Sequence, residues 1–248
     1  MRSRWLRPTC ARRTESSATS RTMPAMHEPV ALLGGTFDPV HYGHLRLADD
    51  VRRALGLAEV RLVPAGDPPH RASPSASAAD RLAMLRLAVP EFPGLVVDDR
   101  ELRRAGKSYT VLTLTELRRE FPDSPLLLLL GADAFRGLPS WHRWDELFDL
   151  AHVVVVERPG VKLEATLPET LLPIWRDRLV RDPKILLSRP AGAILAQPIS
   201  PLDVSATKIR EQLATGGNAA LNSRGLLPPE VLAYIDLHHL YLRGSDAP

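Results

Sequence analysis

Five consecutive leucines, Leu126–Leu130, constrain the fold of this chain more than any other segment. Pro125 precedes the run and Gly131 follows it, and five residues are too few for an independent helix. A strand that is apolar on both faces has to be covered on both sides, which is typical of the centre of a parallel sheet. The run therefore predicts a central strand buried between two layers.

Apolar runs of strand length alternate with stretches of helical periodicity along the rest of the chain. Further strands are expected over Val30–Leu33, Val60–Val63, Leu95–Val97, His152–Val156 and Ile194–Ala196. Helices are expected from about His44 to Leu55, from Ser77 to about Val89, and over Tyr109–Glu120, Ser205–Ala214 and Pro229–Leu240. This alternation predicts an α/β fold, a doubly wound, Rossmann-like parallel sheet with helices on both faces, whose ligands bind outside the carboxyl ends of the strands. Residues 161–192 fit no element of this pattern.

The net charge of +3 and the pI of 9.3 originate at the start of the chain. Residues 1–25 hold six arginines and one acid, which leaves a net charge of −2 on the remaining residues. The rest of the chain therefore lacks the net positive charge that favours binding to DNA or RNA, and we expect no nucleic-acid partner. Segment 1–27 is open to three interpretations: a disordered basic extension or mispredicted start, a targeting peptide, or a segment of another kind.

Cysteine content and hydropathy indicate the cellular location that we expect for the protein. Cys10 is the only cysteine, so neither a disulfide framework nor a cysteine-based zinc site is expected, and a reducing cytoplasm is the natural location. A run of about 18 apolar residues, the length needed to span a membrane, is absent from the sequence. We therefore expect no membrane partner.

The sharpest chemical signal is the segment Gly34–His44, which follows the first expected strand. Gly34 and Gly35 let the backbone turn tightly beside a ligand. His41 and His44 are three residues apart at a helix start, where anions are favoured, so both rings can face one site. This pattern predicts a cradle for a polyphosphate, and the absence of G-x-G-x-x-G argues against a dehydrogenase. A helix cap with two surface histidines is the alternative; a zinc site needs three or four ligands, and no metal-binding residues are expected.

The same segment resembles the signature of the nucleotidyltransferase superfamily with a His-x-Gly-His motif, and over its full length that of the bacterial nicotinate-nucleotide adenylyltransferases. Other segments resemble this family in the same order along the chain: Pro68–Arg71, Asp99–Leu102, Ser108–Thr110, Gly131–Asp133, Pro139–Trp141, Val153–Gly160 and Val204–Arg210. The resemblance covers about Val30 to Leu242. It implies a nucleotidyltransferase type of the doubly wound fold, in a single domain over residues 28–244.

The resemblance also implies a reaction. The adenylyl group of ATP would pass to the phosphate of nicotinate mononucleotide, giving deamido-NAD and pyrophosphate in NAD biosynthesis, with these small molecules as partners and Mg²⁺ as cofactor. The residues implied for ATP binding are Gly34, Gly35, Thr36, Phe37, His41, His44, Ser205, Thr207 and Arg210, of which His41, His44 and Arg210 would be catalytic. Those implied for substrate binding are Tyr109, Thr110, Asp133, Trp141 and His142.

Two positions depart from the family pattern. His142 stands where tyrosine is common, which leaves the choice between nicotinate and nicotinamide mononucleotide open. Ala206 replaces a serine and removes one hydroxyl from the C-terminal motif. Other residues also have a purely structural interpretation: Ser205 as an ordinary helix cap, and Trp141 as a surface anchor beside Trp144. His70 and Arg71 lie on a Pro-rich loop, where they either close over substrate or stay solvated.

Two other functions remain open at this point. One is a different adenylyl- or cytidylyltransferase, for example one acting on phosphopantetheine, although such enzymes usually carry threonine where His41 stands. The second is a non-catalytic nucleotide-binding regulator on the same fold, which could lose catalytic histidines freely. This chain keeps both histidines. The oligomeric state is not indicated.

Overall fold

The computed structural model describes residues 27–68, 74–157, 160, 163–199, 202, 204–215 and 225–242. The expectations for residues 1–26 lie outside the described residues. So does the expectation that His70 and Arg71, on a Pro-rich loop, either close over substrate or stay solvated.

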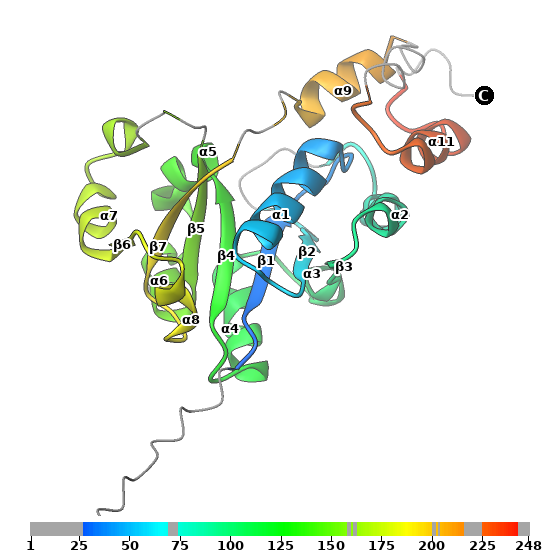
Figure 1. Cartoon of the computed structure of the whole chain (residues 1–248). Coiled ribbons are helices and arrows are strands. Elements are labelled where there is room, and N and C mark those ends of the chain that lie inside the picture. The colour runs from blue at the N-terminus through cyan, green and yellow to red at the C-terminus, as the bar shows by residue number, and fades with distance from the viewer. Residues whose placement is uncertain are drawn as a thin grey trace, which may run out of the picture.

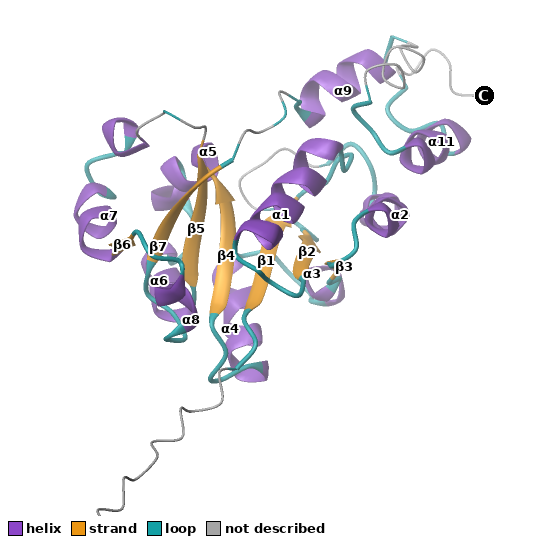
Figure 2. Cartoon of the chain, viewed as in Figure 1, coloured by secondary structure: helices purple, strands orange, loops and turns teal. Residues whose placement is uncertain are grey.

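One seven-stranded sheet forms the framework of the described part, and every strand pairing in it is parallel (Figure 2). The strands are β1 Val30–Gly35, β2 Val60–Pro64, β3 Leu95–Val97, β4 Leu126–Gly131, β5 His152–Glu157, β6 Leu179–Val180 and β7 Ile194–Pro198. Their order is β3-β2-β1-β4-β5-β7-β6. The order reverses between β1 and β4, so the carboxyl ends of these two strands flank the point where ligands bind in such sheets. The predicted fold class is confirmed.

Helices cover both faces of the sheet (Figure 1). The α-helices are α1 Tyr42–Ala54, α2 Ala78–Ala88, α3 Arg100–Arg103, α4 Thr110–Glu120, α5 Ala132–Arg136, α6 Leu147–Leu150, α7 Leu172–Arg178, α8 Lys184–Leu187, α9 Ala206–Leu213 and α11 Pro229–Leu237. Short 3₁₀ helices lie at η1 Val89–Glu91, η2 Leu138–Ser140, η3 Trp144–Glu146 and η4 Leu163–Thr166. One hydrophobic cluster joins the sheet to α1, α2, α9 and α11, and the other joins it to α4, α5, α6 and α7.

The leucine run forms β4 and is buried on both faces, as predicted. Leu127 and Leu129 belong to one cluster, while Leu126, Leu128 and Leu130 belong to the other. Successive side chains of a strand point to opposite faces, so the run contributes to both layers of the core. None of the five is more than 5% exposed.

Local signals set several helix ends. Ser77 caps α2 as expected, its hydroxyl accepting a hydrogen bond from the backbone N–H of Asp80 at 3.1 Å. Gly56 follows α1 with φ of +64°, the conformation that favours glycine. Helix α1 begins at Tyr42, before the predicted start at His44, because His41 takes the extended N-cap conformation. Helix α11 ends at Leu237, earlier than predicted, and His239 has a positive φ.

No helix in the described ranges is both long enough and apolar enough to cross a membrane.

Candidate functional site

The Gly34–His44 segment runs from the carboxyl end of β1 into the first turn of α1. His41 is the N-cap of α1, with φ −146° and ψ 166°, and its side chain is only 5% exposed. The rings of His41 and His44 stack with centroids 3.7 Å apart, and the edge of Phe37 packs against His44 at 5.0 Å. The structure thus brings the predicted histidine pair to one place at a helix start.

Burial sets the charge state of His41. Removal of the ring from water lowers the pKa of His41 to about 4, although a contact with its own backbone raises the pKa by a smaller amount. At neutral pH the imidazole is therefore uncharged, with one N–H donor and one acceptor nitrogen. Within the described part of the chain, Nδ1 of His41 is buried without a hydrogen-bond partner. Buried polar atoms are normally satisfied, so this nitrogen suits a site that a ligand completes.

The C-terminal motif lies against this turn. A Cβ on Gly43 would stand 2.6 Å from Cγ1 of Val204 and 2.9 Å from Nδ1 of His41, so only glycine fits. Ser205 follows Val204 and caps α9, its hydroxyl accepting from the N–H of Lys208 at 3.3 Å. The tight fit at Gly43 thus places the start of α9 beside the histidine pair.

Arg210 joins the two motifs directly. Its guanidinium donates to the backbone carbonyl of Asp38 at 2.7 Å, although the two residues are 172 positions apart. The same guanidinium lies 3.5 Å from the hydroxyl of Thr207. Imidazoles, hydroxyls, a guanidinium and two helix N-termini therefore converge, a combination suited to polyphosphate.

A pocket of about 410 Å³ opens at the carboxyl ends of β1 and β4. Gly34, Gly35 and Thr36 line one side of it and connect it to the histidine turn. All five residues predicted for substrate binding also line it: Tyr109, Thr110, Asp133, Trp141 and His142.

The predicted substrate residues differ in their contacts. The rings of Tyr109 and His142 meet across the pocket with centroids 4.3 Å apart, tilted by 34°. Asp133 has a side chain that is 95% exposed and pairs with Arg136. The pocket therefore offers aromatic surface together with one exposed carboxylate.

Three polar residues of the site were not singled out from the sequence. Arg81 is 1% exposed and donates to the carbonyls of Thr36 at 2.7 Å and Gly66 at 3.3 Å, so it ties two loops together. Glu101 and Thr113 both line the pocket and share a buried hydrogen bond of 2.5 Å. A signal for Arg81 exists, since it falls on the buried stripe of α2 with Met84, Leu85 and Ala88.

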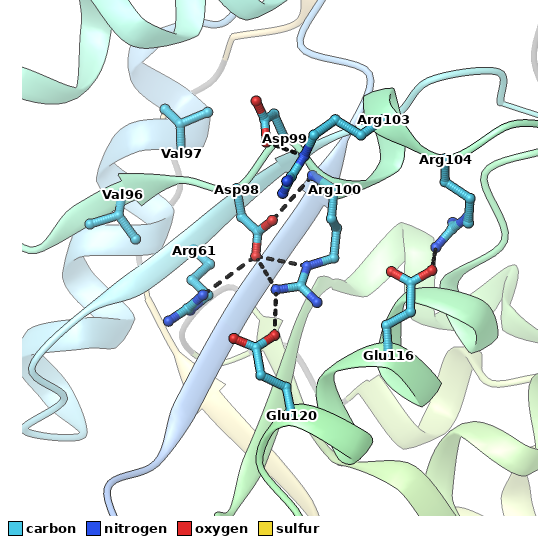
Figure 3. A pocket seen from close by; sticks show the side chains of 10 residues that line it. All are labelled: Arg61, Val96, Val97, Asp98, Asp99, Arg100, Arg103, Arg104, Glu116 and Glu120. Atoms are coloured by element: carbon cyan, nitrogen blue, oxygen red, sulfur yellow. Dashed lines mark hydrogen bonds and ion pairs between the residues drawn. The ribbon is translucent and has the colours of Figure 1, made fainter.

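A second hollow, of about 590 Å³, lies beside β3, α3 and α4 and is rich in arginine (Figure 3). Its arginines are already paired: Arg61 with Asp98 and Glu59, Arg100 with Asp98 and Glu120, Arg103 with Asp99, and Arg104 with Glu116. These ion pairs neutralise the cluster, so it is a weaker candidate for binding an anion than the turn at His41. The pocket at β1 and β4 is the candidate active site.

Comparisons with known proteins agree with this geometry. The model of the family described as "Cytidylyltransferase-like" matches residues 32–212. A protein of Halorhodospira halophila named "Probable nicotinate-nucleotide adenylyltransferase" is 52% identical over 202 residues, covering 82% of this chain and 90% of its own length. A protein of the same name from Aeromonas hydrophila is 51% identical over 215 residues, covering 86% of this chain and 97% of its own. The chain belongs to the nicotinate-nucleotide adenylyltransferase family.

Solved structures show the same fold. The Plasmodium falciparum nicotinic acid mononucleotide adenylyltransferase complexed with NaAD has a TM-score of 0.65 and 18% sequence identity, covering 87% of this chain and 98% of its own. The same Plasmodium enzyme complexed with APC has a TM-score of 0.62. At this identity the likeness concerns the fold alone. The chain thus has the nucleotidyltransferase fold of the nicotinate-nucleotide adenylyltransferase family.

Proposed function

We propose that this enzyme transfers the adenylyl group of ATP to the phosphate of nicotinate mononucleotide, giving nicotinate adenine dinucleotide and pyrophosphate in NAD biosynthesis. The observation that carries the proposal is the convergence of the His41–His44 turn with Ser205–Arg210. Through Gly34–Thr36 this turn is continuous with a pocket that has aromatic walls. Phosphate contacts and ring binding would thus lie on the two sides of one glycine-rich loop.

In the proposed reaction a phosphate oxygen of the mononucleotide attacks the α-phosphorus of ATP. A bond forms between that oxygen and the phosphorus, and the bond to the bridging oxygen breaks, so pyrophosphate leaves with the electron pair. The nucleophile is already anionic, and no side chain has to supply one. Catalysis is then positioning and neutralisation of charge.

The ATP side of the site would supply hydrogen-bond donors to the phosphates. His41 and His44 would donate ring N–H bonds to phosphate oxygens, and Arg210 would add a full positive charge. The start of α9, with Ser205 and Thr207, would hold the β- and γ-phosphates. Gly34, Gly35, Thr36 and Phe37 would contact the nucleotide through the backbone.

On the acceptor side we expect a preference for the acid over the amide. Thr110 is the first residue of α4, where backbone N–H groups and the helix dipole favour an anion such as the nicotinate carboxylate. Trp141 and Tyr109 would stack on the pyridine ring, and His142 would contribute a further donor. Asp133 would accept from a ribose hydroxyl.

Magnesium is proposed to enter with ATP. Among the described residues, no group of three or more His, Cys, Asp or Glu side chains could hold a metal ion. Mg²⁺ commonly binds through substrate phosphates and water, a mode that needs no such group. When bound it would neutralise phosphate charge, while His41, His44 and Arg210 position the phosphates.

Location and domain organisation are proposed on the sequence alone. A cytoplasmic enzyme without a nucleic-acid partner fits the single cysteine and the net charge of −2 outside residues 1–25. We also propose that residues 28–244 form one catalytic domain and that segment 1–27 lies outside it.

Pyrophosphate release tests the proposal. The full chain is incubated with ATP, Mg²⁺ and either nicotinate mononucleotide, nicotinamide mononucleotide or phosphopantetheine, with ATP alone as the blank. Release is expected with nicotinate mononucleotide and to a smaller extent with its amide. Release with phosphopantetheine only, or with none of the three, would overturn the proposed function, the latter in favour of a regulator.

A further inference from the structure

The C-terminal segment 225–242 touches the Gly34–His44 loop at two separate points. The backbone carbonyl of Leu226 accepts a hydrogen bond from the N–H of Tyr42, the first residue of α1, at 3.1 Å. The hydroxyl of Tyr241 donates to Oδ1 of Asp38 at 2.8 Å, a contact between residues 203 positions apart. Helix α11, between these two points, packs against α2 (Figure 1). The end of the chain therefore reaches back to its first motif.

Asp38 connects the C-terminal segment to Arg210. It is 6% exposed, and its carboxylate also accepts from the backbone N–H groups of Ser75 at 2.8 Å and Ala76 at 3.0 Å. Together with the Tyr241 hydroxyl, three donors of the protein therefore bind this carboxylate. The backbone carbonyl of the same residue accepts the guanidinium of Arg210 at 2.7 Å. The position of Asp38 thus decides where the Arg210 guanidinium is held.

Tyr241 is suited to fix that position. Burial, and next the charge of Asp38, raise the pKa of Tyr241, so the hydroxyl keeps its proton and remains a donor. A hydrogen bond to a buried carboxylate is stronger than one between neutral groups. Loss of this donor would leave a buried oxygen of Asp38 under-satisfied, and the loop would have to shift to compensate.

We propose that Tyr241 is a positioning residue of the active site, which fixes Asp38 so that the Asp38 carbonyl holds Arg210 toward the phosphates. Tyr241 itself contacts no substrate in this arrangement. The proposal rests on the proposed function for the role of Arg210, but its structural basis is independent of which mononucleotide accepts the adenylyl group.

The same segment provides a matched control. The hydroxyl of Tyr234 donates to Oδ1 of Asp80 at 2.9 Å, so it also joins the C-terminal segment to a carboxylate. Asp80 belongs to α2, where it is hydrogen-bonded to Ser77 and Tyr234; among the described residues it forms no hydrogen bond with Arg210 or with the histidine turn. Tyr234→Phe therefore removes a tyrosine–carboxylate bond outside the phosphate cradle, in a more exposed place, whereas Tyr241→Phe removes the bond to buried Asp38.

Steady-state kinetics of the full-length variants separate the roles. For Tyr241→Phe we expect kcat to fall about tenfold, with KM for the mononucleotide nearly unchanged, because a transition-state contact is displaced. Tyr234→Phe should keep the kcat of the unsubstituted chain and lower the melting temperature by less than Tyr241→Phe, because its carboxylate partner is less buried. Equal kcat values for the two variants would overturn the proposal. An inactive unsubstituted chain would instead contradict the proposed function.

A double variant tests the route through Arg210. If Tyr241 acts by holding Arg210, adding Tyr241→Phe to Arg210→Ala should lower kcat no further than Arg210→Ala alone. Multiplying effects would overturn the proposal. Rates are compared at a temperature at which circular dichroism shows every variant folded. A Tyr241→Phe chain that folds at no assay temperature would mean a purely structural role, which also contradicts the proposal.

Discussion

His41 combines deep burial with an unsatisfied ring nitrogen. Because burial lowers the pKa of His41 to about 4, the side chain is neutral near pH 7, and we expect it to serve as a hydrogen-bond donor and not as a cation. Arg210 carries the permanent positive charge of the cradle. The stacked ring of His44, 3.7 Å away, extends the same surface. In the proposed site, directional hydrogen bonding and charge thus belong to different residues.

Replacing either histidine should impair turnover without unfolding the chain. His41→Ala and His44→Ala are each expected to lower kcat about 10²–10³-fold, the usual loss for one donor to a developing charge. Pyrophosphate release measures this, with circular dichroism as the check on folding and the exposed His27→Ala as control. A variant that keeps near-full turnover would remove that histidine from the proposed machinery.

Substitution of two tryptophans distinguishes binding of the pyridine ring from surface packing. Trp141 lines the pocket, whereas the ring of Trp144 makes a T-shaped contact with the buried ring of Phe148 in α6. Trp141→Ala should raise KM for nicotinate mononucleotide about tenfold through lost stacking, while KM for ATP stays within about twofold. Trp144→Ala should lower the melting temperature and leave both KM values unchanged. The reverse pattern would show that Trp141 is only a surface anchor.

At the residue scale, the sequence predicted the groups that carry a motif but not the groups that support them. His41 and Ser205 stand in recognisable patterns, and their placement at helix starts follows from local signals. Arg81 and Tyr241 act through contacts 45 and 203 positions away in sequence. The buried stripe of α2 indicates that Arg81 is buried, but the partners of both residues depend on the finished fold and follow from no local pattern.

At the scale of elements, the turn between β1 and α1 depends on Gly43. Gly43→Ala should displace Val204 or the His41 ring, because the added methyl has no room between them. The expected result is a loss of turnover of at least about tenfold with a lower melting temperature. An alanine at Gly34, where no described atom lies within 4 Å of the new methyl, should leave the melting temperature nearly unchanged. A Gly43→Ala chain with full turnover would contradict the close packing.

Elements with a clear hydrophobic pattern were predicted, and the shortest helices were not. The strands other than β6, together with α2, α4 and α9, were placed within about two residues, since burial imposes a pattern over their length. Helices α3, α6 and α8 have four residues each, too few to show a period. The segment 161–192 contains α7, the two-residue strand β6 and α8, which explains why it fitted no element.

At the scale of the whole molecule, two buried histidines couple folding to pH. His152 is fully buried in β5, where its Nδ1 accepts from the N–H of Ala193 at 3.0 Å. Burial lowers the pKa of His152 as well as that of His41. The unfolded chain therefore binds protons that the folded chain excludes, so stability is fully present above about pH 6.5 and is lost as pH falls below it.

Urea unfolding measures this coupling. Between about pH 7 and about pH 5 the free energy of unfolding should fall, His41 alone contributing at most roughly 3 kcal/mol down to its own pKa. His41→Ala should show a smaller fall over the same range, because one buried imidazole is gone. An equal fall in both chains would contradict the burial of His41 as a neutral group.

The fate of the α-phosphate tests adenylyl transfer most directly. ATP labelled at the α-phosphate and ATP labelled at the γ-phosphate are each incubated with the full chain, Mg²⁺ and nicotinate mononucleotide. We expect the α-label to appear in nicotinate adenine dinucleotide and the γ-label in pyrophosphate. An α-label that remains with ATP or is released as AMP, with no labelled dinucleotide, would contradict it.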